Sequence, residues 1–224
     1  MAKLIFVVIT VGLPVFFILY AVLKRKVVIL LLGVATFTIS QLVLRIPLLE
    51  FLRDHSDSFL FLNATKPILM LALIALSAGV FEEIGRWIAM RLFMKEFTFK
   101  NGLIFGMGHG GFEAFILVGL PIVISYLPLI QSMDLYLSAV ERLSAMTVHI
   151  CFSVIVLVGV KNKKFQYCLL SIFLHGVVNF AAGFLMMKSS VVVVEATLVF
   201  LALMMVVITY YIFRRKNNEK ISIK

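Results

Sequence analysis

Residues 66–93 read KPILMLALIALSAGVFEEIGRWIAMRLF. The run is long and apolar enough to cross a lipid bilayer as one helix, because a crossing takes about 20 residues. It nevertheless carries Glu82, Glu83 and Arg86 close together. Ionised side chains are costly in the hydrocarbon core unless they have partners, and they usually mark a functional site. The stretch therefore predicts a membrane-spanning fold with a polar site inside it.

The composition extends the membrane prediction to the whole chain. Hydrophobic residues make up 62% and charged residues 14%, with a mean hydropathy of +1.11, whereas a soluble domain has about half apolar and a quarter charged residues. The 224 residues allow several membrane helices joined by short loops and no second, soluble domain. We predict a single integral membrane domain over residues 1–224, located in the cell membrane.

The apolar runs predict an all-α, polytopic transmembrane bundle of about seven helices. The first run is expected to be a retained helix and not a cleaved signal, because it is too long for a signal core. The segment 121–141, which holds Pro121 and Pro128, is expected to form an interfacial or re-entrant element. The predicted spans are 4–23, 27–48, 66–93, 102–124, 142–160, 165–187 and 190–213.

The net charge of +10 is concentrated at the ends of apolar runs and not along one face, so we expect no nucleic-acid partner. Membrane lipids are the expected surroundings. Because basic loops stay in the cytoplasm, the pattern predicts an outer N-terminus and a cytoplasmic C-terminus. The basic clusters follow the first, third, fifth and seventh spans: Lys24–Lys26; Arg91, Lys95 and Lys100; Lys161, Lys163 and Lys164; Arg214–Lys216.

Polar residues inside four of the spans share one depth. At about 1.5 Å per residue they lie roughly 10 to 17 Å from the cytoplasmic end of each helix. Random placement would scatter them, so the shared depth predicts that they form one site. The residues are Glu82, Glu83, His109, Glu113, His149 and His175.

The spacing within each helix agrees with a shared site. His109 and Glu113 are four residues apart, as are His175 and Asn179, so each pair projects from one helix face. A stripe of small residues at 102, 106 and 110, all glycines, would let a neighbouring helix approach closely. We expect this stripe to face the helix that carries the two glutamates.

The charged residues of the third span also have a structural explanation. Glu83 and Arg86 could be a buried ion pair, because an unpaired charge is costly in the membrane. One arginine neutralises only one of two adjacent carboxylates. Glu82 would then have to be protonated, bound to a metal ion or paired elsewhere.

Other polar residues have similar alternatives. His149, with Ser153 four positions on, could be a hydrogen-bonded core residue. Gln41 and Arg45, one turn apart, are expected to pack between helices or to reach the lipid headgroups. Cys151 and Cys168 lie in apolar runs and are expected to be packing residues and not a disulfide.

Carboxylates and imidazoles at this depth fit hydrolysis. Glu82 with His109 could activate a water, and His175 with Asn179 could stabilise the oxyanion. Alternatively, a zinc ion could hold the attacking water, with Glu82 or Glu83 as the base. No HExxH motif is present, so the metal version depends on residue type and depth alone. Its candidate ligands are His109, Glu113, His149 and His175.

The same residues resemble a known set of motifs. Glu82-Glu83 followed by Arg86, Phe105-xxx-His109, His149 and His175-xxx-Asn179 occur in that order. They resemble the motifs of the intramembrane protease superfamily that includes type II CAAX prenyl endopeptidases, bacteriocin-processing (CPBP) proteases and PrsW. EExxR followed by GHGGFEA is most similar to the YhfC-type membrane peptidases. The resemblance covers roughly residues 75 to 185, within a protease-like core at about 66–187.

The resemblance implies a membrane-embedded peptidase that acts on a membrane-associated peptide or protein. Glu82 would activate water with help from His109, His175 and Asn179 would hold the water or the oxyanion, and Glu83 and Arg86 would brace the site. Two departures stand out. The CAAX pattern has three residues between the glutamates and the arginine, where this chain has two, and the simplest CAAX pattern has no counterpart of His149.

Several alternatives stay open at this point. Members of the superfamily are labelled both glutamic and metallo-type, and Glu113 could replace or supplement His109. A proton- or cation-coupled transporter could use the same midplane carboxylates and histidines, although no inverted repeat is visible. A third possibility is a non-catalytic descendant that binds a peptide. The sequence indicates neither the substrate nor the oligomeric state.

Overall fold

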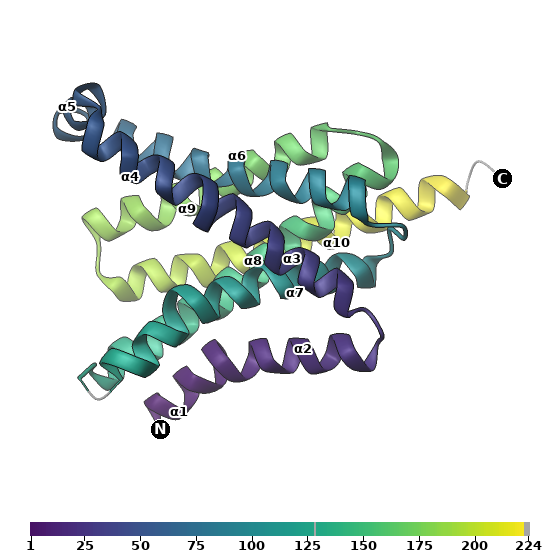
Figure 1. Ribbon diagram of the computed structural model, residues 1–224, viewed down its shortest axis with the longest axis horizontal. Coiled ribbons are helices and arrows are strands. Elements are labelled where there is room, and N and C mark those ends of the chain that lie inside the picture. Colours follow the sequence, from purple (N-terminus) through teal and green to yellow (C-terminus); the bar gives the residue numbers. More distant parts are fainter. Residues whose placement is uncertain (128, 222–224) are drawn as a thin grey trace.

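Helices dominate the fold because lipid offers the backbone no hydrogen-bonding partner, so each spanning segment must satisfy its own N–H and C=O groups. The computed structural model describes residues 1–127 and 129–221, with side chains as far as Arg215. All regular structure in these residues is helical (Figure 1). The α-helices are α1 (Ala2–Val7), α2 (Leu13–Leu23), α3 (Val27–Phe37), α4 (Ile46–His55), α5 (Asp57–Thr65), α6 (Pro67–Phe93), α7 (Phe99–Glu113), α8 (Ser132–Asn162), α9 (Gln166–Lys188) and α10 (Val191–Ile221).

Wider π-helical turns connect several of these helices without a break. Val8–Gly12 joins α1 to α2, Thr38–Arg45 joins α3 to α4, and two further π-helical segments continue α7 to Tyr126. Such turns are rare and often occur at functional sites. The segment Thr38–Arg45 contains Gln41, which contacts Glu82.

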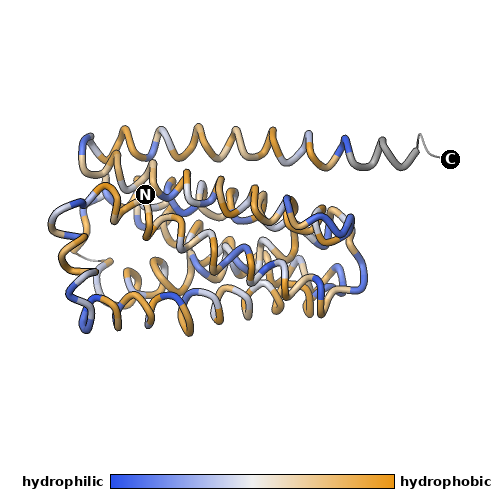
Figure 2. Tube along the Cα trace, turned by 90° about the horizontal axis from the view of Figure 1, so that it is seen from above, coloured by the Kyte–Doolittle hydropathy of each residue, from blue (hydrophilic) through white to orange (hydrophobic). Residues whose placement is uncertain are grey.

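Seven helical stretches are long and apolar enough to cross a membrane, so the all-α fold with about seven spans is confirmed for the described residues. The chain is a multi-pass membrane protein. Polar residues gather at the turns, and the helices between them are mainly apolar (Figure 2). The spans are Ala2–Leu23, Val27–His55, Pro67–Phe93, Phe99–Tyr126, Ser132–Asn162, Gln166–Lys188 and Val191–Arg215.

The expected separate interfacial or re-entrant element at 121–141 is wrong for the residues that the structure describes, and Pro128 lies outside them. The helix that begins as α7 continues past Pro121 to Tyr126, and α8 begins at Ser132. Proline lacks the N–H that a regular helix needs. Pro121 lies between two π-helical segments, Ala114–Gly119 and Ile122–Tyr126, where the hydrogen-bond ladder is already irregular, and this explains why the helix tolerates it.

All of the basic turns lie at one end of the bundle. The α2–α3, α6–α7 and α8–α9 turns and the end of α10 are at the right of Figure 1. Lys26 in the first turn pairs with Glu96 in the second at 2.7 Å, and this hydrogen bond lowers the pKa of the Glu96 carboxyl. We refer to this as the basic end and to the opposite side as the non-basic end.

Helix α8 is the centre of the bundle. Within its most apolar stretch 78% of the residues are buried, against 28% to 33% for the other spans. It contacts α1, α6, α7, α9 and α10. Residues on α8 can therefore meet residues from several other helices.

The glycine stripe of α7 faces α8, so the expectation that it faces the helix of the two glutamates is wrong. A Cβ atom on Gly106 would lie 2.5 Å from Ile150 Cα, and one on Gly110 would lie 2.9 Å from His149 Cβ. The other main neighbour of α7 is α3. The close contact made possible by small residues thus brings His109 next to His149.

Candidate functional site

The site is built from the middle of four helices. Helix α6 contributes Glu82, Glu83 and Arg86, and the depth-matched residues of α7, α8 and α9 meet them there. All six residues predicted to share one depth are brought together. Glu82, Glu83, Arg86, His109, His149 and His175 are buried, and Glu113 is partly exposed.

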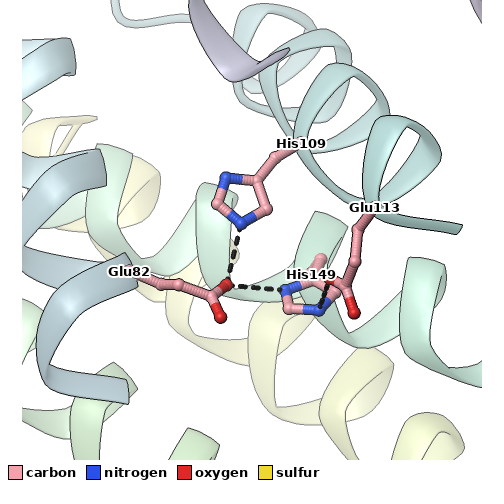
Figure 3. Close-up of side chains that lie close together, drawn as sticks. All are labelled: Glu82, His109, Glu113 and His149. Carbon is pink, nitrogen blue, oxygen red and sulfur yellow. Dashed lines mark hydrogen bonds and ion pairs between the residues drawn. The ribbon is translucent and has the colours of Figure 1, made fainter. Parts of the chain in front are cut away.

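Glu82 is at the centre of this cluster. Its Oε2 atom lies 2.8 Å from His109 Nε2, 3.3 Å from Arg86 Nη2 and 3.5 Å from His149 Nδ1. Figure 3 shows the carboxylate between the two imidazoles. The Oε1 atom accepts a hydrogen bond from the Gln41 side-chain amide and lies 3.8 Å from His175 Nε2. One carboxylate thus contacts groups from all of the site helices and from the second span.

Glu83 and Arg86 form the ion pair that the sequence suggested as a structural explanation. Arg86 Nη1 donates to Glu83 Oε1, which is also 2.8 Å from His175 Nδ1. Arg86 Nη2 lies near Glu82 and 2.8 Å from His149 Nδ1. The guanidinium therefore bridges both glutamates and one histidine, and it positions the site as well as compensating charge.

Glu113 extends the cluster towards the non-basic end. Its Oε2 is 2.6 Å from His149 Nε2, and its Oε1 accepts from Arg142 Nη1 at 3.3 Å. Arg142 also pairs with Glu141. The residues predicted from the sequence did not include Arg142. A signal existed, because Arg142 precedes His149 by seven residues, or about two helical turns, and so lies on the same face.

Gln41 and Arg45 lie between helices, as predicted, but Gln41 is also part of the site. Besides its bond to Glu82, its Oε1 atom accepts from Arg45 Nη1 at 3.0 Å. Arg45 also donates to Ser77 Oγ at 3.0 Å. The π-helical segment Thr38–Arg45 thus holds Gln41 against the central carboxylate.

His175 and Asn179 lie on α9 beside a polar pocket. His175 stacks on Phe152, with ring centroids 4.9 Å apart and an interplanar angle of 13°. Both residues line a pocket of ≈ 90 Å³ together with Glu113, Arg142 and His149. Asn179 is only partly buried. The structure therefore places both predicted oxyanion donors next to the cluster.

Four of these side chains could hold a metal ion. Glu82, His109, Glu113 and His149 each offer one ligand atom, and these atoms all lie within 4.8 Å of one another. Imidazole and carboxylate ligands suit zinc, which they approach to about 2 Å. Three residues of this group belong to the predicted ligand set. The fourth is Glu82, while His175, the remaining predicted ligand, is outside the group.

The charges of the cluster also fit a bound cation. Three buried or partly buried carboxylates (Glu82, Glu83 and Glu113) face the guanidinium of Arg86, and Arg45 lies behind Gln41, which contacts Glu82; the charge of Arg142 is matched by that of Glu141. Formally this leaves one uncompensated negative charge among these side chains, which is costly inside a membrane. A cation bound at the cluster would neutralise it.

Comparison with known proteins agrees with these motifs. The family described as "YhfC intramembrane metalloprotease" matches residues 5–134 and 119–201. The chain is also similar to the protein described as "Uncharacterized membrane protein YhfC" from Bacillus subtilis (strain 168), with 37% identity over 138 residues. That match covers 48% of this chain and 54% of the relative, so the chain spans about half the length of the curated relative it matches. No solved structure matches.

Proposed function

Because the chain belongs to the family of YhfC intramembrane metalloproteases, we propose that it is an endopeptidase that hydrolyses a peptide bond within or next to the bilayer. The observation that carries the proposal is the buried contact between Glu82 and His109 at 2.8 Å, surrounded by further imidazole and carboxylate groups. A buried carboxylate beside imidazoles is suited to activating water. The substrate would be a membrane-associated peptide or protein.

The residues divide into ligands and reacting groups. His109, His149 and Glu113 would hold zinc, a set of two histidines and one glutamate that recurs in catalytic zinc sites. When bound there, zinc supplies Lewis-acid chemistry, which polarises a carbonyl group and lowers the pKa of water. Glu82 would be the general base that takes the proton from the attacking water. Its second oxygen is held by Gln41, so Oε2 stays directed at the histidines.

The remaining residues bind and orient. His175 and Asn179 line the pocket beside the cluster and would donate hydrogen bonds to the carbonyl oxygen as negative charge develops on it. Glu83 and Arg86 would brace this arrangement, because the guanidinium reaches Glu82, Glu83 and His149 at once. Arg86 would thereby limit the movement of the base between binding and reaction.

Metal analysis combined with cleavage tests this assignment. We expect the purified protein to carry one zinc per chain, His109→Ala and His149→Ala to lose it, and Glu82→Gln to keep it while losing cleavage of membrane-anchored reporter peptides. The reason is that a base is needed for the reaction and not for binding the ion. Loss of cleavage should be at least about 100-fold, the usual contribution of a general base.

Different outcomes separate the alternatives. Full cleavage by the metal-free protein would contradict the zinc assignment and favour a glutamic mechanism with the same Glu82. Unchanged cleavage by Glu82→Gln would contradict the role of the base. If no variant cleaves any peptide, and Glu82→Gln instead abolishes cation-driven uptake into proteoliposomes, the chain is a transporter.

A further inference from the structure

The site is closed by apolar side chains on the side of the basic end. Each of the four site helices contributes buried residues there, one or more turns beyond its polar residue. Trp87 and Met90 follow Glu83 on α6, and Phe105 precedes His109 on α7. Helices α8 and α9 contribute buried apolar residues at the same level. The cluster consists of Trp87, Ala89, Met90, Met94, Phe105, Val156, Leu157, Val160, Cys168 and Ile172. Such a cluster is close-packed and leaves little room for water.

The opposite side of the site is polar and becomes steadily less buried. Side-chain exposure rises from 3% for Glu82 to 15% for Glu113 and 26% for Glu141. The ≈ 90 Å³ pocket follows this direction, because its walls run from His149 and His175 to Arg142 and Ala182, which lie nearer the non-basic ends of their helices. Polar walls and this volume allow several water molecules.

From these two observations we infer that water reaches Glu82 from the non-basic end, through the polar pocket between α7, α8, α9 and α10, and that the scissile peptide enters from the same end. The inference rests on the proposed function for its peptide substrate. Since basic loops are cytoplasmic in most membrane proteins, the non-basic end faces away from the cytoplasm. The substrate class is therefore a chain segment that is exposed at, or just inside, the extracytoplasmic face of the membrane.

Cysteine labelling in oriented vesicles tests the direction of access without any need for catalysis. Cys151 and Cys168 are first replaced by alanine, and a single cysteine is placed in the pocket wall as Ala182→Cys, or as Ala145→Cys should the first variant fold poorly. The probe is a small, charged, membrane-impermeant methanethiosulfonate. Lys163→Cys in a basic turn and Ser189→Cys in the α9–α10 turn report which end each vesicle preparation exposes.

The pocket cysteine should react in the preparation in which Ser189→Cys reacts and be protected in the one in which Lys163→Cys reacts. A chain that retains only Cys168, which lies in the apolar cluster, should be protected in both. The inference is overturned if the pocket cysteine reacts together with Lys163→Cys, or if both pocket variants stay unreactive in folded protein. A failure of the protease assignment appears separately, as absence of cleavage with the labelling pattern unchanged.

Discussion

At the scale of single residues, the chemistry depends on how one carboxylate is held. Glu82 has two oxygens with different partners: the Gln41 amide contacts Oε1, while His109, His149 and Arg86 contact Oε2. A hydrogen bond to one oxygen fixes the orientation of the whole group. Groups of this kind, which orient a reacting or ligating side chain, usually affect activity or metal affinity by about 10–100-fold.

Gln41→Leu removes the only amide in the segment Thr38–Arg45 and leaves a similar volume. We expect it to lower kcat by about 10–100-fold with KM little changed, because the substitution frees the base to rotate without touching the substrate. Kinetics with a membrane-anchored reporter peptide measure both constants. Thr38→Val on the same segment is the matched control, since its hydroxyl donates to Val34 O. A wild-type kcat for Gln41→Leu would refute the positioning role.

Arg142→Gln tests whether the contact with Arg142 positions Glu113. Without the guanidinium, Glu113 loses its partner at 3.3 Å and is free to turn away from His149. We expect zinc affinity to fall by about 10–100-fold, as measured by competition with a chelator. Arg53→Gln is the control, because Arg53 pairs only with its exposed neighbour Asp54 among the described residues. Equal affinity in the two variants would show that Arg142 does not support the metal site.

At the scale of helices, small residues decide which faces meet. Lipid is as apolar as a leucine side chain, so the hydrophobic effect gives little preference for one apolar helix face over another, and close packing takes its place. The glycine stripe of α7 lets its backbone approach α8, and Gly79 of α6 approaches α9, where an added Cβ would lie 2.6 Å from Ile172 O. These two contacts pair the four site helices, and α8 joins the pairs through its contacts with α6 and α9.

Gly106→Ala should separate α7 from α8. The added methyl group would lie 2.5 Å from Ile150 Cα, a backbone atom that cannot rotate away. We expect the free energy of unfolding to fall by about 1–3 kcal/mol, the usual cost of overpacking, although alanine favours a helix by about 1 kcal/mol. Denaturation in mixed detergent micelles measures the change. Gly12→Ala, whose nearest neighbours are 3.9 Å or farther, should be neutral or stabilising; equal effects at both positions would contradict this account.

At the scale of the whole molecule, the basic turns and the polar pocket lie at opposite ends of the bundle. The turns between α2 and α3, α6 and α7, and α8 and α9 share one end (Figure 1). The pocket extends from the site towards the other end. The orientation of the bundle thus determines the compartment from which a substrate would enter.

Reporter fusions test this orientation. A protein that fluoresces only in the cytoplasm should be bright when inserted after Lys163 and dark when inserted after Ser189, because the first position is in a basic turn and the second is not. An enzyme that is active only outside the cytoplasm should give the opposite pattern at the same two positions. The reverse result for both reporters would invert the bundle and, with it, the side of substrate entry.

The sequence alone determined the membrane bundle, its seven spans and the depth of the polar residues, because hydropathy and helix rise are local properties of each run. It also identified Glu82, Glu83, Arg86, His109 and His149 as neighbours. It could not determine how each helix is rotated about its own axis. That rotation depends on contacts between distant segments.

Features that depend on the rotation of each helix about its axis became visible only in the tertiary structure. In the structure the glycine stripe faces α8 and not α6, the Gln41 amide contacts Glu82, and Arg142 contacts Glu113. Apolar residues also close the site on one side, and a polar pocket remains on the other. The physical reason is that these features depend on side-chain packing between helices, which the hydropathy of each run does not encode.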